Sequence, residues 1–162
     1  MFEVVTGGAG FIGSHLVDSL VGLGKEVVVI DSLVAGRRKT IAGHLKSGKV
    51  RLVVSDLLTN GWQDELKGAS RVWHLAADPD VRQSAMNPDP TFNNNIAATY
   101  RVLEAIRLAQ VRELVFTSTS TVYGNATAIP TPETYTPMEP VSVYGGSKLA
   151  CEAIISAYCH SF

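Results

Sequence analysis

The chain has 162 residues, a net charge of −1 and an apolar content of 46%. This length suits a single domain with a buried core, and because no basic run is longer than residues 37–39, nothing indicates a nucleic-acid or anionic-membrane partner. No apolar stretch reaches about 18 residues and residues 1–6 lack the pattern of a signal peptide, so we expect neither a spanning helix nor a secretory leader.

Short apolar runs rich in β-branched residues alternate with helical patterns along the chain. The runs are apolar on both faces, which is typical of strands in a parallel sheet covered on both sides. This alternation predicts an α/β fold, a Rossmann-type doubly wound parallel sheet. Strands are expected at residues 2–6, 26–31, 50–55, 71–75 and 113–118, and helices at residues 11–23, within 38–45 and 63–66, at 91–109 and from 143 to the end.

The last predicted helix follows the longest irregular stretch, residues 124–140. Ser142 comes after Pro140 and is the expected N-cap of this helix. Cys151 and Cys159 fall on the same helix about 12 Å apart along its axis, which exceeds the reach of a disulfide. We therefore expect two reduced thiols in a cytoplasmic protein.

The first predicted strand runs into a glycine-rich turn, TGGAGFIG, at residues 6–13. Glycines there allow a tight turn and let backbone N–H groups at a helix N-terminus approach a pyrophosphate. An ordinary tight turn between a strand and a helix is the alternative. The second predicted strand ends in Asp31, whose carboxylate can accept ribose hydroxyls and disfavours a 2′-phosphate, so NAD is favoured over NADP. Arg37 and Arg38 follow that strand and keep NADP open.

Tyr144 and Lys148 lie four residues apart at the start of the last predicted helix, so their side chains share one helix face. A phenol has a pKa of about 10, and lowering it by about three units takes about 4 kcal/mol. A nearby cation favours the phenolate, which makes Lys148 a suitable neighbour. This spacing also arises by chance on helix surfaces. The pair therefore indicates a catalytic site only in combination with the glycine turn and Asp31.

Five motifs in order resemble the extended short-chain dehydrogenases/reductases, in the branch of nucleotide-sugar epimerases and dehydratases. The resemblance covers the whole chain and implies an NAD-binding Rossmann domain over residues 1–162. The motifs are residues 6–13 with Gly7, Gly10 and Gly13, the pair Asp56 and Leu57 after the third strand, residues 74–77 (HLAA), residues 116–124 (FTSTSTVYG), and residues 144–148 (YGGSK).

The resemblance implies roles for individual residues. Tyr144 corresponds to the general base or acid for the sugar hydroxyl, and Lys148 holds the nicotinamide ribose and lowers the pKa of Tyr144. Thr119 corresponds to the residue that hydrogen-bonds the same sugar oxygen, with Ser118 as the second choice. The cofactor-binding residues implied are Gly7, Gly10, Phe11, Ile12, Gly13, Asp31, Asp56, Leu57, Ala76, Ala77, Asn95, Tyr144 and Lys148. No metal is expected, because no histidine has a second ligand at a metal-like spacing.

The residues after Thr119 select among the activities that the resemblance allows. Dehydratases of the family have Asp-Glu there and decarboxylases have Glu two residues on, whereas this chain has Ser120 and Thr121. The resemblance therefore implies a nucleotide-sugar 4-epimerase that acts on a UDP-hexose by reversible oxidation at C4, with tightly held NAD. A 4,6-dehydratase, a decarboxylase and a dinucleotide-binding module without catalysis remain alternatives. Some bacterial hexose epimerases carry a cofactor-contacting lysine where this chain has Asp78 and Pro79.

Family members are longer and continue into two more strands and a C-terminal substrate domain. We therefore expect a Rossmann domain truncated before the last strands and the substrate domain, which is absent. The resemblance also implies a homodimer through the helices at residues 91–109 and 143–162. Their apolar positions could serve that dimer or simply cover the sheet; these are Val102, Leu103, Ile106, Ile154, Ile155 and Tyr158.

Three further polar residues have competing interpretations. His74 at a strand end is expected to be a core histidine rather than a catalytic base. Asn95 is implied by the resemblance near the lysine through a structural water, although helix capping or packing is an equal alternative. Ser84 corresponds to a substrate contact in the family, and helix capping is again an equal alternative.

Overall fold

The computed structural model describes residues 2–162. Contacts divide the chain into two compact units. Unit 1 is Met1–Ala76 together with Arg101–Thr117, and unit 2 is Ala77–Tyr100 together with Ser118–Phe162. No helix of residues 2–162 is both long and apolar enough to cross a membrane.

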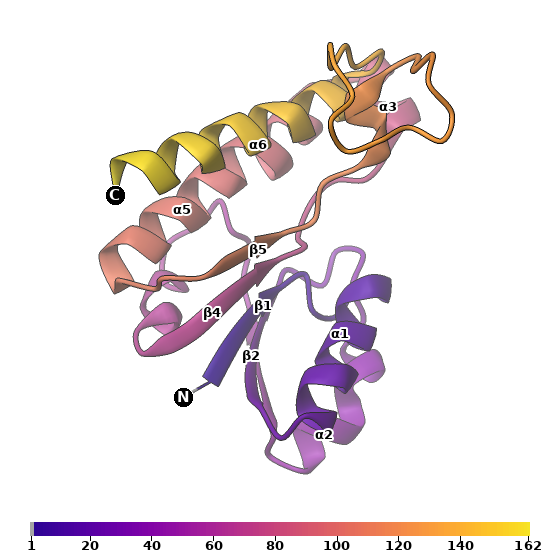
Figure 1. Ribbon diagram of the computed structural model, residues 1–162. Helices are drawn as coiled ribbons and strands as arrows, with labels where there is room; N and C mark the ends of the chain where they lie inside the picture. The colour runs from indigo at the N-terminus through magenta and orange to yellow at the C-terminus, as the bar shows by residue number, and fades with distance from the viewer. Residues whose placement is uncertain (1) are drawn as a thin grey trace. The chain divides into compact units, whose positions relative to one another are not determined.

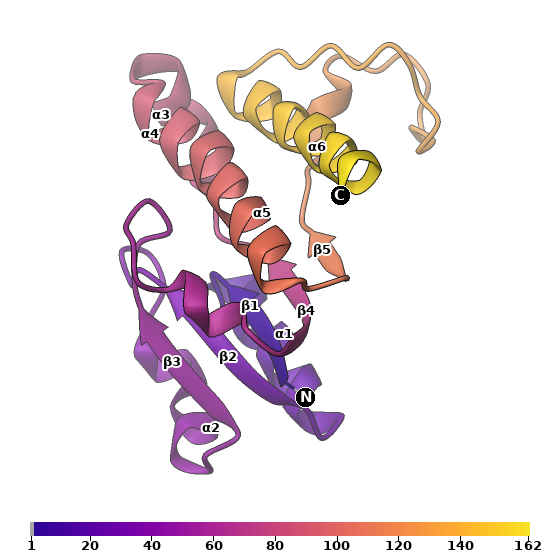
Figure 2. The ribbon, with the colours of Figure 1, turned by 90° about the vertical axis from the view of Figure 1, so that its left-hand side faces the viewer.

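Unit 1 is built on a five-stranded parallel sheet with the strand order β3-β2-β1-β4-β5 (Figures 1 and 2). The register brings the ends of the strands level, since Thr6 pairs with Ile30 and with His74. The predicted α/β fold with a Rossmann-type parallel sheet is therefore confirmed. The strands are β1 (Phe2–Thr6), β2 (Glu26–Asp31), β3 (Val50–Val54), β4 (Ala69–His74) and β5 (Leu114–Phe116).

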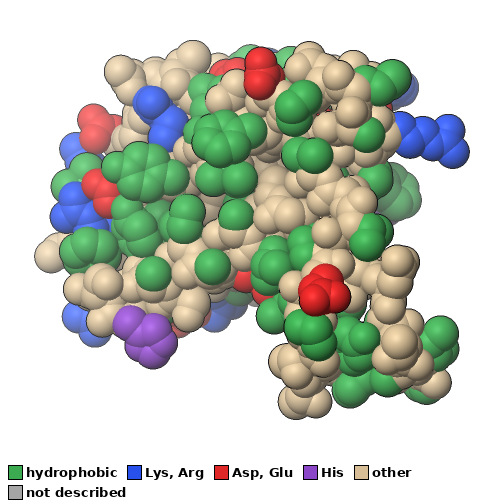
Figure 3. Space-filling view, turned by 90° about the horizontal axis from the view of Figure 1, so that it is seen from above, with side chains coloured by type: hydrophobic (Ala, Val, Ile, Leu, Met, Phe, Trp, Pro, Cys, Tyr) green, Lys and Arg blue, Asp and Glu red, His purple; other side chains and the backbone are tan. Residues whose placement is uncertain are grey.

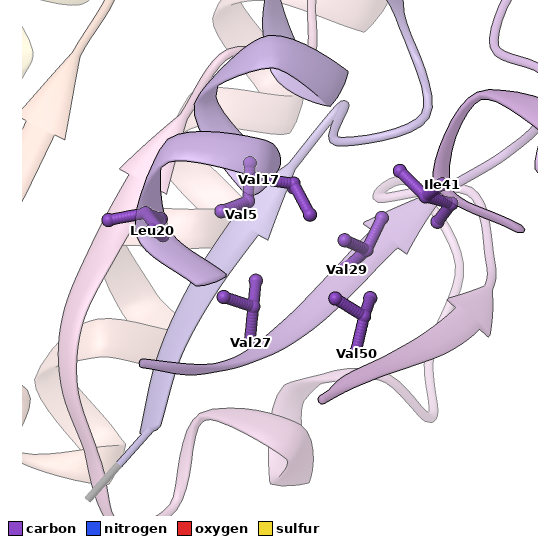
Figure 4. Packing of buried hydrophobic residues seen from close by; sticks show 7 residues of the cluster. All are labelled: Val5, Val17, Leu20, Val27, Val29, Ile41 and Val50. Carbon is purple, nitrogen blue, oxygen red and sulfur yellow. The ribbon is translucent and has the colours of Figure 1, made fainter. Parts of the chain in front are cut away.

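Short helices connect these strands, and two of them cover one face of the sheet. Figure 1 shows α1 and α2 on that face, while α5 lies on the other. Apolar side chains from α1, η1 and the first three strands form a buried cluster, in which Val29 and Ile41 are 0% exposed (Figure 4). Each such side chain contributes about 1.5–3 kcal/mol of burial. The elements are α1 (Phe11–Gly22), η1 (Arg38–Ile41), α2 (Ala42–Lys46), η2 (Gln63–Leu66) and α5 (Ala98–Ala109).

The predicted strand boundaries are correct for β1 and β2 and too long for β5. Residues 113–118 were expected to form this strand, but pairing with β4 covers only Leu114–Phe116. The chain then turns at Thr119, which is the N-cap of a 3₁₀ helix, η4 (Ser120–Tyr123). The sequence pattern misses the end of the strand because Thr117 and Thr119 are β-branched residues of the kind that strands favour.

Unit 2 is formed by short helical segments and one long helix. The helix predicted at residues 91–109 is present, but a π-helical segment, η3 (Phe92–Ala97), interrupts its α-helical hydrogen bonding between α4 (Asp89–Thr91) and α5. A further helix, α3 (Val81–Met86), was not predicted. It begins at Asp80, whose carboxylate accepts the N–H groups of Arg82 and Gln83, and its six residues are too few to show a clear periodicity.

The long helix of unit 2 is α6 (Val143–Ser161), and Ser142 caps it as predicted. The Gly145 N–H donates to the Ser142 hydroxyl at 3.0 Å. Gly145 also lets α6 approach η4 closely, because a Cβ there would lie 2.8 Å from the Thr121 carbonyl oxygen. The first turn of α6, which carries Tyr144, is thus fixed by a cap and by a close backbone contact.

Candidate active site

The glycine turn of unit 1 has no room for side chains. Gly7 has a φ of 72°, and a Cβ on it would lie 2.8 Å from the Ala76 nitrogen. A Cβ on Gly13 would lie 2.2 Å from the Gly7 carbonyl oxygen, which in turn accepts the Gly10 N–H at 3.1 Å. The backbone therefore closes on itself here, which is the arrangement needed to bring N–H groups near a bound phosphate.

The N-terminus of α1 opens directly from this turn. Its N-cap, Gly10, has no side chain, so the first N–H groups of the helix lack a side-chain cap. Phe11 and Ile12 are 82% and 62% exposed, unlike the buried residues further along α1. A twelve-residue helix with an uncapped N-terminus after a glycine turn is well suited to hold an anion.

Asp31 lies at the end of β2 and is 8% exposed. One carboxylate oxygen accepts the Ala9 N–H at 2.9 Å and the other accepts the Leu33 N–H at 2.8 Å. A carboxylate has about four acceptor positions, so two remain for ribose hydroxyls. Arg37 donates its backbone N–H to the Ala9 oxygen at 2.9 Å, while its side chain is exposed to solvent.

Asp56 and Leu57, which the resemblance places among the cofactor-binding residues, follow β3. Asp56 is exposed and accepts the Leu58 N–H at 2.8 Å, which fixes the turn. Leu57 is buried, and its carbonyl oxygen accepts the indole N–H of Trp62 at 3.2 Å. This turn of unit 1 is therefore held by the backbone of Leu57 and leaves the Asp56 side chain at the surface.

His74 and Ala76 lie at the end of β4 and shortly after it. His74 is 1% exposed, and its Nδ1 is 2.7 Å from the Thr6 hydroxyl, so the prediction of a core histidine is confirmed. The Ala76 N–H donates to the same hydroxyl at 3.3 Å. Thr6 thus fixes the backbone of β4 beside the glycine turn within unit 1.

In unit 2, the Asn95 side chain links three segments. Its amide oxygen accepts the Asp78 N–H at 2.7 Å and its amide nitrogen donates to the Asp78 carbonyl oxygen at 3.2 Å. The same nitrogen donates to the Ser147 hydroxyl at 2.9 Å, and that hydroxyl donates to the Tyr144 carbonyl oxygen at 2.7 Å. Asn95 is 2% exposed and lies within η3, whose N-cap is Thr91, so it packs between these segments and does not cap a helix. Its place near the cofactor stays a prediction.

Tyr144 and Lys148 lie on the first turns of α6, as expected from their spacing. Tyr144 is half-buried, whereas Lys148 is 3% exposed. Burial lowers the pKa of the Lys148 ammonium below its ordinary value, and the charges of Cys151 and Glu152 act in the opposite direction. Cys151 is itself buried, and its burial raises the pKa of the thiol. Lys148 is thus held in a weakly hydrated place, where charges act strongly on one another.

Thr119 and Ser118 are bonded to different parts of unit 2. The Thr119 hydroxyl accepts the Thr121 N–H at 3.3 Å and lies 3.1 Å from the Thr121 hydroxyl. The Ser118 hydroxyl donates to a carboxylate oxygen of Glu152 on α6. Because the Ser118 hydroxyl is bonded to Glu152 on α6, Thr119 remains the preferred residue for the sugar oxygen. This role of Thr119 stays a prediction.

The structure excludes helix capping for Ser84 and identifies residues that the sequence did not indicate. Ser84 does not cap α3, since that role belongs to Asp80, and its buried hydroxyl donates to the Val81 carbonyl oxygen at 2.7 Å. Ser147 and Glu152 were not predicted to belong to the site. Their only signal in the sequence is their nearness to Tyr144 and Lys148 on one helix, because their partners are distant in sequence.

A parallel sheet with a glycine turn at the end of its first strand and an acid at the end of its second defines a dinucleotide-binding protein. The family model of the NAD dependent epimerase/dehydratase family matches residues 4–162. The chain therefore belongs to this family, which is NAD-dependent.

Relatives and solved structures agree with this assignment. The chain is 39% identical over 156 residues to UDP-glucose 4-epimerase of Streptococcus mutans, covering 96% of this chain and 46% of the relative. A crystal structure of UDP-galactose 4-epimerase is 49% identical, with a TM-score of 0.90, over 100% of this chain and 52% of that one. DesIV, a dTDP-glucose 4,6-dehydratase from Streptomyces venezuelae with NAD and TYD bound, is 34% identical, with a TM-score of 0.93, over 99% and 52%. The chain thus spans about half the length of the proteins it matches.

Proposed function

We propose that residues 1–162 form the NAD-binding Rossmann domain of a nucleotide-sugar 4-epimerase that interconverts UDP-glucose and UDP-galactose. The observation that carries this proposal is the pair Ser120 and Thr121 after Thr119, where the other reactions of the family require carboxylates. A 4-epimerase needs only a reversible removal of a proton from the 4-hydroxyl and of a hydride from C4. Thr119, Tyr144 and Lys148 supply the groups for the proton, and no second acid is required.

The residues of each unit fit a part of NAD. In unit 1, the closed glycine turn and the uncapped start of α1 suit the pyrophosphate, and Asp31 has free acceptor positions for the ribose. In unit 2, we assign the nicotinamide end to Ala77, Asn95, Tyr144 and Lys148. When bound, NAD supplies the hydride acceptor and donor for C4. The full set proposed for the cofactor is Gly7, Gly10, Phe11, Ile12, Gly13, Asp31, Asp56, Leu57, Ala76, Ala77, Asn95, Tyr144 and Lys148.

Tyr144 is the proposed base for the sugar hydroxyl. A phenol acts as a base at neutral pH only when its pKa falls by about three units, which takes about 4 kcal/mol. An exposed ammonium contributes about 1 kcal/mol at most. Lys148 is 3% exposed, so its charge acts through a less polar medium and can contribute more. The Thr119 hydroxyl would donate to the same sugar oxygen and hold it against Tyr144.

The 4,6-dehydratase is the second candidate, because the backbone matches DesIV with a TM-score of 0.93. Water loss from C5 and C6 needs an acid and a base in addition to the tyrosine. The positions that would provide them hold Ser120 and Thr121, neither of which ionises near neutral pH. This difference favours the epimerase, and the reaction products distinguish the two.

The test is to incubate the whole protein that contains this chain with UDP-galactose and to identify the products by NMR. Inversion at C4 with UDP-glucose as the product supports the proposal, and a 4-keto-6-deoxy sugar contradicts it. Tyr144→Phe should lower turnover at least about a hundredfold, within the range expected for an acid–base group. Tyr158→Phe, a half-buried tyrosine on the same helix, is the matched control and should leave turnover unchanged.

We also propose a homodimer formed through residues 91–109 and 143–162. Figure 3 shows hydrophobic side chains at the surface on the side of α6. Val102 and Leu103 are buried within the chain, so they cover its own core, whereas Ile154, Ile155 and Tyr158 are only half-buried. A sedimentation experiment should give a mass that rises with concentration, and a monomer at every concentration contradicts the dimer.

Both cysteines are free, which suits a cytoplasmic protein.

A further inference from the structure

The residue before Thr119 is bonded to the helix that carries Tyr144 and Lys148. The Ser118 hydroxyl donates to a carboxylate oxygen of Glu152, which lies one turn beyond Lys148 on α6. This bond joins two segments of unit 2 that are 34 residues apart in sequence. It therefore fixes the start of the Thr119 segment relative to α6.

Glu152 also affects the charge of the buried Lys148 side chain. Burial disfavours the ammonium, and the negative charges that act against this effect are those of Cys151 and Glu152. The pKa of the Cys151 thiol is raised by its burial, so this thiol is neutral at neutral pH. The standing negative charge beside Lys148 is thus that of Glu152. The other elements packed against α6 carry Tyr123 on η4, Arg82 on α3 and Asp89 on α4.

We propose that Glu152 is a positioning residue whose single carboxylate ties Ser118 to α6 and supplies the counter-charge of Lys148. One part of this inference rests on the proposed function, namely that the charge of Lys148 acts on the phenol of Tyr144.

The placement of Glu152 along α6 supports both parts of this role. Lys148 is one turn away, about 6 Å along the axis, while Tyr144 is about 12 Å away. The carboxylate can therefore stabilise the ammonium with little opposition to a negative charge on the phenol, because the interaction falls with distance. A carboxylate beside Tyr144 itself would raise the pKa of the phenol and defeat the purpose of Lys148.

Two substitutions separate the two tasks of Glu152. Glu152→Gln keeps an acceptor for Ser118 and removes the charge, whereas Ser118→Ala removes the donor and keeps the charge. NMR titration of the Lys148 side chain, assigned with Lys148→Met, measures its pKa directly. We expect Glu152→Gln to lower this pKa by about half a unit or more. The exposed Glu133→Gln is the matched control and should leave it unchanged.

Amide hydrogen exchange at residues 118–121 measures how firmly the bond between Ser118 and Glu152 holds this segment. It should be faster in Ser118→Ala than in the parent protein and little changed in Glu152→Gln. An unchanged Lys148 pKa in Glu152→Gln, or unchanged exchange in Ser118→Ala, would overturn the proposal. If Glu152→Gln fails to fold, Glu152→Asp is the substitute, because it keeps the charge on a shorter side chain. It should retain the pKa of Lys148 and make amide exchange at residues 118–121 faster. A lowered Lys148 pKa or unchanged exchange in this variant contradicts the proposal. Neither readout needs NAD or a sugar, so both stand whether or not the whole protein is an epimerase.

Discussion

The two units build their parts of the candidate site in different ways. Unit 1 shapes its glycine turn from backbone alone, since Gly7 and Gly13 have no room for a Cβ. Unit 2 orders its candidate catalytic segment through side chains, with Asn95 linking three segments and Glu152 bonded to Ser118. A site for a phosphate needs closely approaching N–H groups, whereas acid–base chemistry needs side chains held at fixed positions. Substitutions in the two units should therefore fail for different reasons.

The largest effect is expected in the backbone-built turn of unit 1. A Cβ in Gly13→Ala would lie 2.2 Å from a carbonyl oxygen that cannot swing away. We expect a loss of about 3 kcal/mol or more in the free energy of unfolding, with NAD binding lost. Denaturant unfolding and calorimetric titration with NAD measure the two. Gly22→Ala is the control on the same helix, where nothing lies within 4 Å, and should be neutral or stabilising by up to about 1 kcal/mol.

A somewhat smaller effect is expected at the side-chain network of unit 2. Asn95→Ala leaves the Asp78 N–H without its acceptor and the Ser147 hydroxyl without its donor. We expect unfolding to become easier by about 2–4 kcal/mol, measured by denaturant titration. Asn93→Ala, an exposed position two residues earlier, should stay within about 0.5 kcal/mol. Equal losses at the two positions would contradict the view that unit 2 depends on this network.

A third test concerns a backbone constraint of unit 2 other than the close contact at Gly145. Gly124 has a φ of 62°, and a Cβ on it would lie 1.9 Å from the Glu139 carbonyl oxygen. Gly124→Ala should cost about 1–3 kcal/mol, less than Gly13→Ala, because residues 124–140 are irregular and can adjust. Gly146→Ala on α6 meets nothing within 4 Å and is the control, with a gain of up to about 1 kcal/mol. Thermal unfolding of both variants measures the difference.

The smallest effect concerns the dependence of stability on pH. Burial lowers the pKa of Lys148 in the folded chain below its value of 10.5 in the unfolded chain. Between these two values the unfolded state binds more protons, so this residue makes stability rise with pH. Lys148→Met removes the effect. Its stability relative to the parent protein should therefore be greatest near neutral pH and decline as the pH approaches 10.5, as measured by denaturant unfolding. If the difference in stability between Lys148→Met and the parent protein does not change with pH, the pKa of Lys148 is not lowered by burial.

The sequence predicts unit 1 better than unit 2 for a physical reason. Strands such as β1 and β2 and the helix α1 are specified by apolar patterns and glycines that act locally, and their boundaries follow from these signals. Ser142 is likewise a local signal, and its cap of α6 was predicted. The helix α3 is too short to show a period, and a π-helical turn has the same residue pattern as an α-helical one, so neither can be recognised in advance.

The candidate site follows the same division. The roles of Gly7, Gly13 and Asp31 can be inferred from residues that are neighbours in the sequence or end adjacent strands. Asn95 and Glu152 act through partners at Asp78 and Ser118, which only the folded chain brings together. Helix capping, one of the alternatives for Asn95, does not occur because its amide is bonded to Asp78 and Ser147 instead.

The most direct test of the central claim is the fate of the hydrogen at C4. The whole protein that contains this chain should convert UDP-galactose carrying deuterium at C4 into UDP-glucose with the deuterium retained at C4. Retention is predicted because the hydride is removed and returned within one site and does not exchange with water. Loss of the deuterium, its transfer to C6 of a 4-keto-6-deoxy sugar, or no conversion at all would contradict a 4-epimerase.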